Sequence, residues 1–149
     1  MQRILVIHGP NLQLLGTREP GIYGKTTLAS INAELKKQAK RRAVTLTIVQ
    51  SNHEGRIVEI IGKAGKKFAG IIINPAAYTH TSVAIRDAIA ASGVLTIEVH
   101  LSNIYNREEF RRHSLISPVC RGTIMGFGPA SYYLGLQTLL DLLKPCPPV

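Results

Sequence analysis

Arg3-Ile4-Leu5-Val6-Ile7-His8-Gly9-Pro10 decides the fold, because it is a short apolar, β-branched run closed by a Gly-Pro turn. The same pattern of apolar run and turn returns at residues 44–50, 69–74, 93–100 and 122–127. Runs of this length and composition are typical of strands buried in a sheet. The sequence therefore predicts five β-strands.

Stretches with the period of an amphipathic helix lie between and after these runs, at residues 26–42, 54–67, 82–92, 106–113 and 130–143. Strands that alternate with helices indicate a parallel sheet covered on both faces. Five strands of this length suit the doubly wound order 2-1-3-4-5, which is the flavodoxin-like α/β fold. We expect residues 1–149 to form one domain, with a frayed tail at 144–149.

The composition excludes several classes of protein. The chain has 149 residues, of which 45% are hydrophobic and 18% charged, which indicates a globular domain and not a disordered or fibrous chain. No apolar run approaches the length that spans a bilayer, and the start lacks the cleavage pattern of a signal peptide, so a cytoplasmic protein is expected. Cys120 and Cys146 form no Cys-x-x-Cys motif, and we interpret both as incidental.

The net charge of +9, from 18 Lys and Arg against 9 Asp and Glu, suggests nucleic acid, an anionic lipid surface or small anionic substrates as partners. The densest basic runs, 36–42 and 63–67, fall near the ends of predicted helices, which favours solvated faces. A nucleic-acid binder remains an alternative that predicts affinity falling steeply with salt. With 5% aromatic residues and no recognised motif, we expect a small anionic substrate, no nucleic acid and no membrane.

The functional site is expected beyond the carboxyl ends of the strands, between the first and third strands, where the strand order reverses. Two polar loops follow strands at this end, residues 10–25 and 101–106, and long loops in compact domains usually bind or cover ligands. The first of these loops has neither a Gly-x-Gly-x-x-Gly turn nor a Walker motif, so a nucleotide site is not favoured.

The polar residues at these strand ends favour acid–base chemistry. Glu98 and His100 lie two apart at the end of the fourth strand, which places them on one face, and a carboxylate beside an imidazole favours its protonated form. Arg107 and Arg111, four apart in the predicted helix 106–113, are candidates to face an anion, Arg111 more strongly than Arg107. The sequence shows no metal-ligand spacing and no serine with a clear base, and Lys25 is the one lysine in these loops.

Three motifs give the chain a resemblance to the type II 3-dehydroquinate dehydratases. The resemblance runs nearly the whole length, from Ile4 to about Leu143. The first combines His8-Gly9-Pro10-Asn11, Leu14-Leu15-Gly16-Thr17-Arg18-Glu19-Pro20 and Tyr23-Gly24. The second is Asn74-Pro75-Ala76-Ala77-Tyr78-Thr79-His80-Thr81-Ser82 with Arg86-Asp87, and the third is Glu98-Val99-His100-Leu101-Ser102-Asn103 with Arg107-Glu108-Glu109-Phe110-Arg111-Arg112-His113-Ser114.

The resemblance implies trans-elimination of water from 3-dehydroquinate to 3-dehydroshikimate through an enolate, the third step of the shikimate pathway, without cofactor or metal. It makes Tyr23 the base that removes the proton next to the ketone, with Arg18 lowering its pKa. Asn11 would hold the water that stabilises the enolate oxygen, and His100, oriented by Glu98, would protonate the departing hydroxyl. The substrate would be bound by the side chains of Asn74, His80 and Arg111 and by the backbone amides of Leu101 and Ser102.

The resemblance also implies a homo-oligomer, a dodecamer built from trimers, in which Asp87 reaches a substrate in a neighbouring subunit. Two departures, Gln13 in place of Asn and Ala76-Ala77 in place of Gly-Gly or Gly-Ala, concern fine substrate positioning. The alternative function is a non-catalytic flavodoxin-like binding module, such as a receiver domain or flavin carrier. It would need acidic residues or a hydroxyl-rich phosphate loop where this chain has His8-Gly9-Pro10-Asn11. Synthesis through the shikimate route and breakdown of quinate use the same reaction, so the sequence leaves that choice open.

Overall fold

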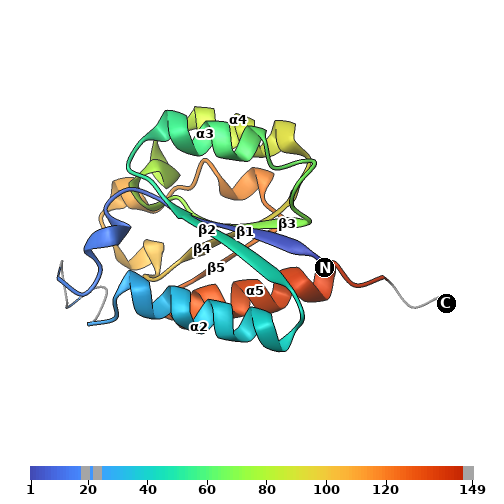
Figure 1. Cartoon of the computed structure of the whole chain (residues 1–149). Coiled ribbons are helices and arrows are strands. Elements are labelled where there is room, and N and C mark those ends of the chain that lie inside the picture. The colour runs from blue at the N-terminus through green and yellow to red at the C-terminus, as the bar shows by residue number, and fades with distance from the viewer. Residues whose placement is uncertain (18–20, 22–24, 146–149) are drawn as a thin grey trace.

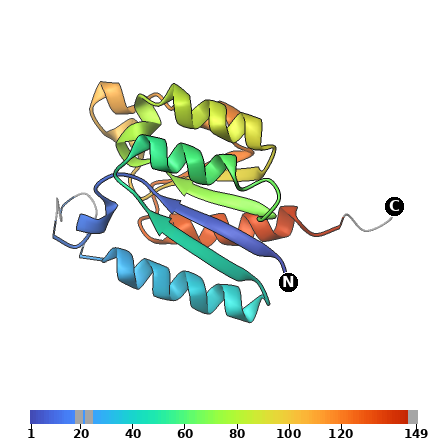
Figure 2. The same ribbon diagram turned by 45° about the horizontal axis from the view of Figure 1, so that its top comes forward.

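The computed structural model describes residues 1–17, 21 and 25–145. Five parallel strands form one sheet in the order β2-β1-β3-β4-β5, as the sequence predicts. The strands are β1 (Arg3–His8), β2 (Thr45–Gln50), β3 (Gly70–Asn74), β4 (Leu95–His100) and β5 (Gly122–Met125). Figures 1 and 2 show the twisted sheet running through the middle of the molecule.

Helices cover both faces of this sheet (Figure 1). The helices are α2 (Leu28–Arg41), α3 (Glu54–Gly62), α4 (Val83–Ser92) and α5 (Ala130–Leu142). Alternate residues of β1 pack into two separate cores: Ile4 and Val6 face α2 and α5, while Leu5 and Ile7 face α3 and α4. This alternation follows from the two-residue period of a strand, and it explains why β1 is apolar almost throughout.

Local signals in the sequence set the ends of the helices. The side chain of Thr27 caps α2 by accepting a hydrogen bond from the Ser30 N–H, at 3.1 Å, and Ser82 caps α4 in the same way through the Ile85 N–H, at 2.9 Å. Gly93 follows α4 with a φ of 64°, the left-handed conformation that ends many helices. These caps agree closely with the boundaries predicted from the sequence.

Two predicted helices differ from the structure. The predicted helix 54–67 ends at Gly62, and residues 63–67 form turns, because helix propensity is low at Gly62 and Gly65. The predicted helix 106–113 is wrong: this segment holds two short 3-10 turns, Ile104–Asn106 and Glu109–Arg111. Arg107 separates them in an extended conformation, with φ of −115° and ψ of −174°, which no helix can contain.

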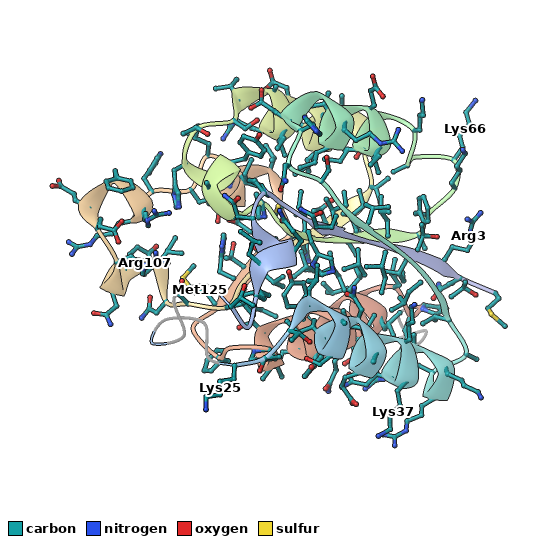
Figure 3. The ribbon with its side chains drawn as sticks, turned by 60° about the vertical axis from the view of Figure 1, so that its left-hand side comes forward. Arg3, Lys25, Lys37, Lys66, Arg107 and Met125 are labelled. Carbon is teal, nitrogen blue, oxygen red and sulfur yellow. The ribbon has the colours of Figure 1, made fainter. Side chains whose placement is uncertain are left out.

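The ends of β1 and β3 lie side by side, because His8 is paired with Asn74 in the parallel register. Gly9 continues from β1 so close to the next strand that a Cβ atom there would lie 2.5 Å from the Pro75 carbonyl oxygen. A glycine is therefore required at this crossing. Met125 ends β5, and Arg107 lies in the loop after β4. Figure 3 shows both at the opposite end of the molecule from Arg3, where β1 begins, and from Lys66. Among the described residues no helix is long and apolar enough to cross a membrane.

Candidate active site

A pocket opens beyond the carboxyl ends of β1, β3 and β4, where the strand order reverses. Its empty space, open solvent at its mouth included, is about 740 Å³. Its lining comes from the loops after these three strands: Pro10, Asn11, Leu12, Leu15, Asn74, Ala76, Ala77, His80, His100, Leu101, Ser102, Ile104, Arg107 and Arg111. The pocket lies where the strand order predicts a site.

His100 and Glu98 form a buried ion-pair candidate at the base of this pocket. The Nε2 atom of His100 lies 2.6 Å from Oε1 of Glu98, as their common strand face predicts. Glu98 has no exposed surface and His100 is 5% exposed. Because a carboxylate only accepts, Nε2 carries a proton, and Nδ1 is the ring nitrogen left to exchange a proton with a ligand.

The carboxylate of Glu98 is held by three hydroxyl groups as well as by His100. Ser114 donates to Oε1 at 2.9 Å, and Ser117 and Thr123 donate to Oε2, Thr123 at 3.3 Å. Burial alone would raise the pKa of Glu98, but the hydrogen bond and charge of His100 and the two serine hydroxyls bring that pKa below its ordinary value. Glu98 therefore stays ionised in a place where an unpaired charge could not exist.

His80 presents an acceptor to the pocket. Its Nδ1 atom lies 2.8 Å from the backbone carbonyl of His113, and a carbonyl can only accept, so Nδ1 carries the proton. Burial lowers the pKa of His80; the bond to the His113 carbonyl opposes this shift, while the charges of His100 and Arg111 add to it. At neutral pH the ring is therefore neutral, and Nε2 can accept a hydrogen bond from a ligand hydroxyl.

Arg107 and Arg111 both line the pocket although the helix predicted to align them is broken. Glu108 lies between them: its carboxylate is 2.7 Å from Nε of Arg111 and 3.6 Å from Nε of Arg107. The hydrogen bond from Arg111 lowers the pKa of Glu108. Two guanidinium groups and one carboxylate leave a net positive charge at this wall, which suits an anionic ligand.

Asn11 lies in the loop after β1 and Asn74 ends β3, and both line the pocket. Asn11 adopts a left-handed conformation, with φ of 67°, and its N–H donates to the Asn52 side-chain oxygen at 2.9 Å. Asn74 is 3% exposed, and its Oδ1 accepts from the Ala76 N–H at 3.0 Å. Both asparagines shape turns and still face the pocket.

The structure brings together most of the predicted site residues. Leu101 and Ser102 follow β4 and line the pocket with His100, and the Leu101 carbonyl accepts from the Gly128 N–H at 2.9 Å. Asp87 lies elsewhere, exposed on α4 and outside the pocket of its own chain. Arg18 and Tyr23 lie outside the described residues.

Sequence reasoning missed part of the lining. An apolar wall is formed by Leu12, Leu15 and Ile104, and the sequence offered no signal that separates these from ordinary core residues. Arg107, which the sequence left open, is buried at the pocket, its side chain 11% exposed. Burial, and the charge of Glu98 to a smaller extent, raise the pKa of Cys120 to about 12, so its thiol is a poor nucleophile. In the described part of the chain no group of three or more His, Cys, Asp or Glu could hold a metal ion.

Comparison with known proteins agrees with this geometry. Residues 2–140 match the family model of dehydroquinase class II. A 3-dehydroquinate dehydratase from Trichodesmium erythraeum is 59% identical over 95% of this chain and 94% of its own length. A second, from a Nostoc species, is 60% identical over 95% of this chain and 96% of its own.

Two solved structures share the fold over nearly their whole length. The type II dehydroquinase from Butyrivibrio crossotus superposes with a TM-score of 0.91, at 45% identity, and covers 93% of this chain and 97% of its own. The type II dehydroquinase from Propionibacterium acnes gives a TM-score of 0.89 at 40% identity, over 97% and 98% of the two chains. The sequence, the fold and the position of the pocket lead to one conclusion: this chain belongs to the class II dehydroquinase family.

Proposed function

We propose that this pocket removes water from 3-dehydroquinate to give 3-dehydroshikimate, the third step of the shikimate pathway, through an enolate. The relatives named 3-dehydroquinate dehydratase match 95% of the chain at about 60% identity, which supports this hydro-lyase activity. The observation that carries the proposal is the buried pair of His100 and Glu98 at the base of the pocket, 2.6 Å apart.

This pair fits the role of a general acid. Elimination of water needs a proton for the departing hydroxyl, because hydroxide is a poor leaving group. The ionised Glu98 orients the His100 ring, so that Nδ1 faces the pocket as the nitrogen that would give a proton to the substrate and recover it from solvent. General acid catalysis of this kind contributes about 10² to 10⁴ in rate.

Tyr23 is proposed as the base, with Arg18 beside it, by the resemblance of their motif. A free tyrosine is ionised to only about 0.1% at pH 7, a deficit of about 4 kcal/mol, and a close guanidinium offsets one to three pKa units of it. Leu15 lines the pocket, and a Cβ at Gly16 would lie 3.3 Å from the Lys25 carbonyl oxygen, so described residues on either side of this motif lie close together.

The remaining groups are proposed to bind the substrate and its intermediate. Asn11 would hold a water against the enolate oxygen, and the backbone amides of Leu101 and Ser102 would take the carboxylate. The neutral ring of His80 would accept from a substrate hydroxyl, beside Asn74 and Arg111. Asn74 ends β3, His80 lies in the loop after it, and Arg111 lies in the loop after β4; all three line the pocket.

The test mixes the purified protein with 3-dehydroquinate in buffer treated with a chelator and follows the ultraviolet absorbance of the conjugated enone. We expect absorbance to grow with the wild type and not with Tyr23→Phe, which keeps the ring and loses the base. A folded wild-type protein that gives no signal would refute the activity. A Tyr23→Phe variant that keeps wild-type turnover would refute only the assignment of the base.

We also propose that the protein assembles into a dodecamer of trimers in which Asp87 reaches the substrate of a neighbouring subunit, and that it acts in the cytoplasm. Asp87 is exposed on α4, and Val83, one helical turn before it, is an apolar side chain that is 56% exposed. Light scattering measures the assembled mass. A catalytically active monomer would contradict the proposal.

A further inference from the structure

The turn that carries Asn11 into the pocket is held from outside by the loop after β2. Asn52 lies in this loop, is exposed, and does not line the pocket. Its Oδ1 atom lies 2.9 Å from the backbone nitrogen of Asn11 and 3.1 Å from Nε2 of Gln50, the last residue of β2. The mechanism above uses neither Asn52 nor Gln50.

The donors fix the orientation of the Asn52 amide. A backbone N–H can only donate, so the atom that meets the Asn11 N–H must be the Asn52 oxygen. Gln50 requires the same orientation, because its Nε2 also lies 3.2 Å from the Gly9 carbonyl oxygen, which can only accept. Gln50 therefore presents N–H groups here, and Oδ1 of Asn52 accepts from both sides.

Asn52 is itself anchored from the other side of β1. The sheet order places β2 and β3 on either side of β1. The hydroxyl of Tyr78, in the loop after β3, donates to the Asn52 backbone carbonyl at 2.6 Å. Asn52 thus joins the loops that follow three neighbouring strands, at the point where the chain of Asn11 leaves the sheet.

The backbone of Asn11 explains why this support matters. Asn11 is left-handed, with φ of 67° and ψ of −1°, a conformation that costs free energy for any residue with a Cβ atom. It precedes the 3-10 turn Leu12–Leu14, but its side chain makes no capping bond to these described residues. The N–H of Asn11 is therefore bound to Asn52, while its amide side chain is left for the pocket that Asn11 lines.

We infer that Asn52 is a positioning residue: by holding the Asn11 N–H, it keeps the left-handed turn, and so the Asn11 side chain, in place in the pocket. This inference rests on the proposed function, in which Asn11 holds a water against the enolate oxygen. That water would stabilise charge that develops in the transition state. A loosened turn should therefore slow turnover more than it weakens substrate binding.

The test is a double-mutant cycle between Asn52→Ala and Asn11→Gly, with kcat and KM for 3-dehydroquinate as the readout. Glycine adopts the left-handed conformation without strain, so Asn11→Gly removes the side chain and spares the turn. We expect Asn52→Ala to lower kcat about three- to tenfold, the size expected for one hydrogen bond, with little change in KM. In the Asn11→Gly background the same change should have no further effect.

Two further variants serve as controls. Asn52→Asp keeps an oxygen that can accept from the Asn11 N–H, and it should retain most of the wild-type kcat. Ser92→Ala also removes a side chain that accepts from a backbone N–H, that of Val94, at 3.2 Å. Ser92 lies before the start of β4, at the end of the sheet away from the pocket, so this change should leave kcat unchanged.

Three results would overturn the inference. The first is an equal loss in both backgrounds, because a merely structural Asn52 acts whether or not the Asn11 side chain is present. The second is a folded Asn52→Ala protein with wild-type kcat, and the third is an Asn52→Asp protein as slow as Asn52→Ala. If Asn52→Ala does not fold, Gln50→Ala, which removes a donor to Asn52, should give a smaller loss of kcat. Persistence of that loss in Asn11→Gly would overturn the inference.

The proposed function is tested separately, by turnover of the wild type. If the wild type is inactive, the rate at which the Asn11 N–H exchanges with deuterated water, measured by mass spectrometry, still decides whether Asn52 holds this turn. Asn52→Ala should speed this exchange about three- to tenfold, because the hydrogen bond that protects the N–H is lost. An unchanged exchange rate would overturn the inference.

Discussion

The neutral state of His8 predicts how the stability of this protein depends on pH. Burial holds the pKa of His8 at about 4 in the folded protein, against 6.5 for an ordinary histidine. Between these values the unfolded chain binds a proton that the folded protein does not, so the unfolding free energy rises with pH. His8 therefore contributes its full stabilisation above pH 6.5 and loses it as the pH falls toward 4.

The size of this effect follows from the two titration curves. With pKa values of 6.5 and about 4, lowering the pH from 7 to 4.5 removes about 2.5 kcal/mol of unfolding free energy through His8 alone. The His8→Asn variant does not titrate, and its side-chain oxygen can still accept from the Tyr132 hydroxyl, which lies 2.7 Å from Nδ1 of His8. The difference between the wild type and this variant should thus shrink by about 2 to 3 kcal/mol over the same range.

Urea unfolding at pH 7, 6, 5 and 4.5, at one protein concentration, measures this difference. The other four histidines are common to both proteins, so their titration cancels in the comparison. The variant His53→Asn replaces an exposed histidine and is expected to follow the wild type. Parallel pH profiles for the wild type and His8→Asn would refute the reasoning, because they would show that His8 binds its proton equally in both states.

Three further predictions concern single positions. Glu98→Gln should lower kcat about ten- to hundredfold with little change in KM, because it removes the charge-assisted bond to His100, worth about 1.5–3 kcal/mol. A wild-type kcat would contradict the role of Glu98 in orienting His100. Ala76 has a φ of 51°, so Ala76→Gly should raise the unfolding free energy by up to about 1 kcal/mol. The control Ala77→Gly should lower it by about 0.5–1 kcal/mol, and chemical denaturation measures the unfolding free energy of both variants. Gly9→Ala should cost about 1–3 kcal/mol or prevent folding, since its Cβ would meet a backbone carbonyl oxygen at 2.5 Å, and an unchanged melting temperature would refute this.

The sheet was predictable because its signal is local and repeated. Each strand is an apolar run closed by a turn, and the alternation with helices leaves few parallel arrangements. The predicted helix at 106–113 failed because periodicity cannot detect the extended conformation of Arg107, which breaks the segment. The backbone of Ala76 has a positive φ, which glycine adopts without strain. The sequence alone does not reveal this conformation.

The candidate site was predictable where a strand aligns its residues. Glu98 and His100 share a face by the two-residue period, so their contact could be expected from the sequence. The hydroxyls that stabilise Glu98 could not, because Ser114 and Ser117 come from an irregular loop and Thr123 from the next strand. The contact between His8 and Tyr132 was also hidden, since α5 brings this tyrosine back from 124 residues away in the chain.

The Glu98–His100 pair and the His8–Tyr132 pair lie on opposite faces of one sheet, and each side chain has the charge state that its own surroundings favour. Ile97 and Val99 face α5, so Glu98 between them points to the other side of the sheet. There, hydroxyl groups and His100 keep Glu98 ionised. His8 points toward α2 and α5, where it must stay neutral to accept from Tyr132. A negative charge close to His8 would favour its protonated form and remove that acceptor. A sheet of this kind thus holds an ionised carboxylate on one face and a neutral histidine on the other, with packed apolar residues between them.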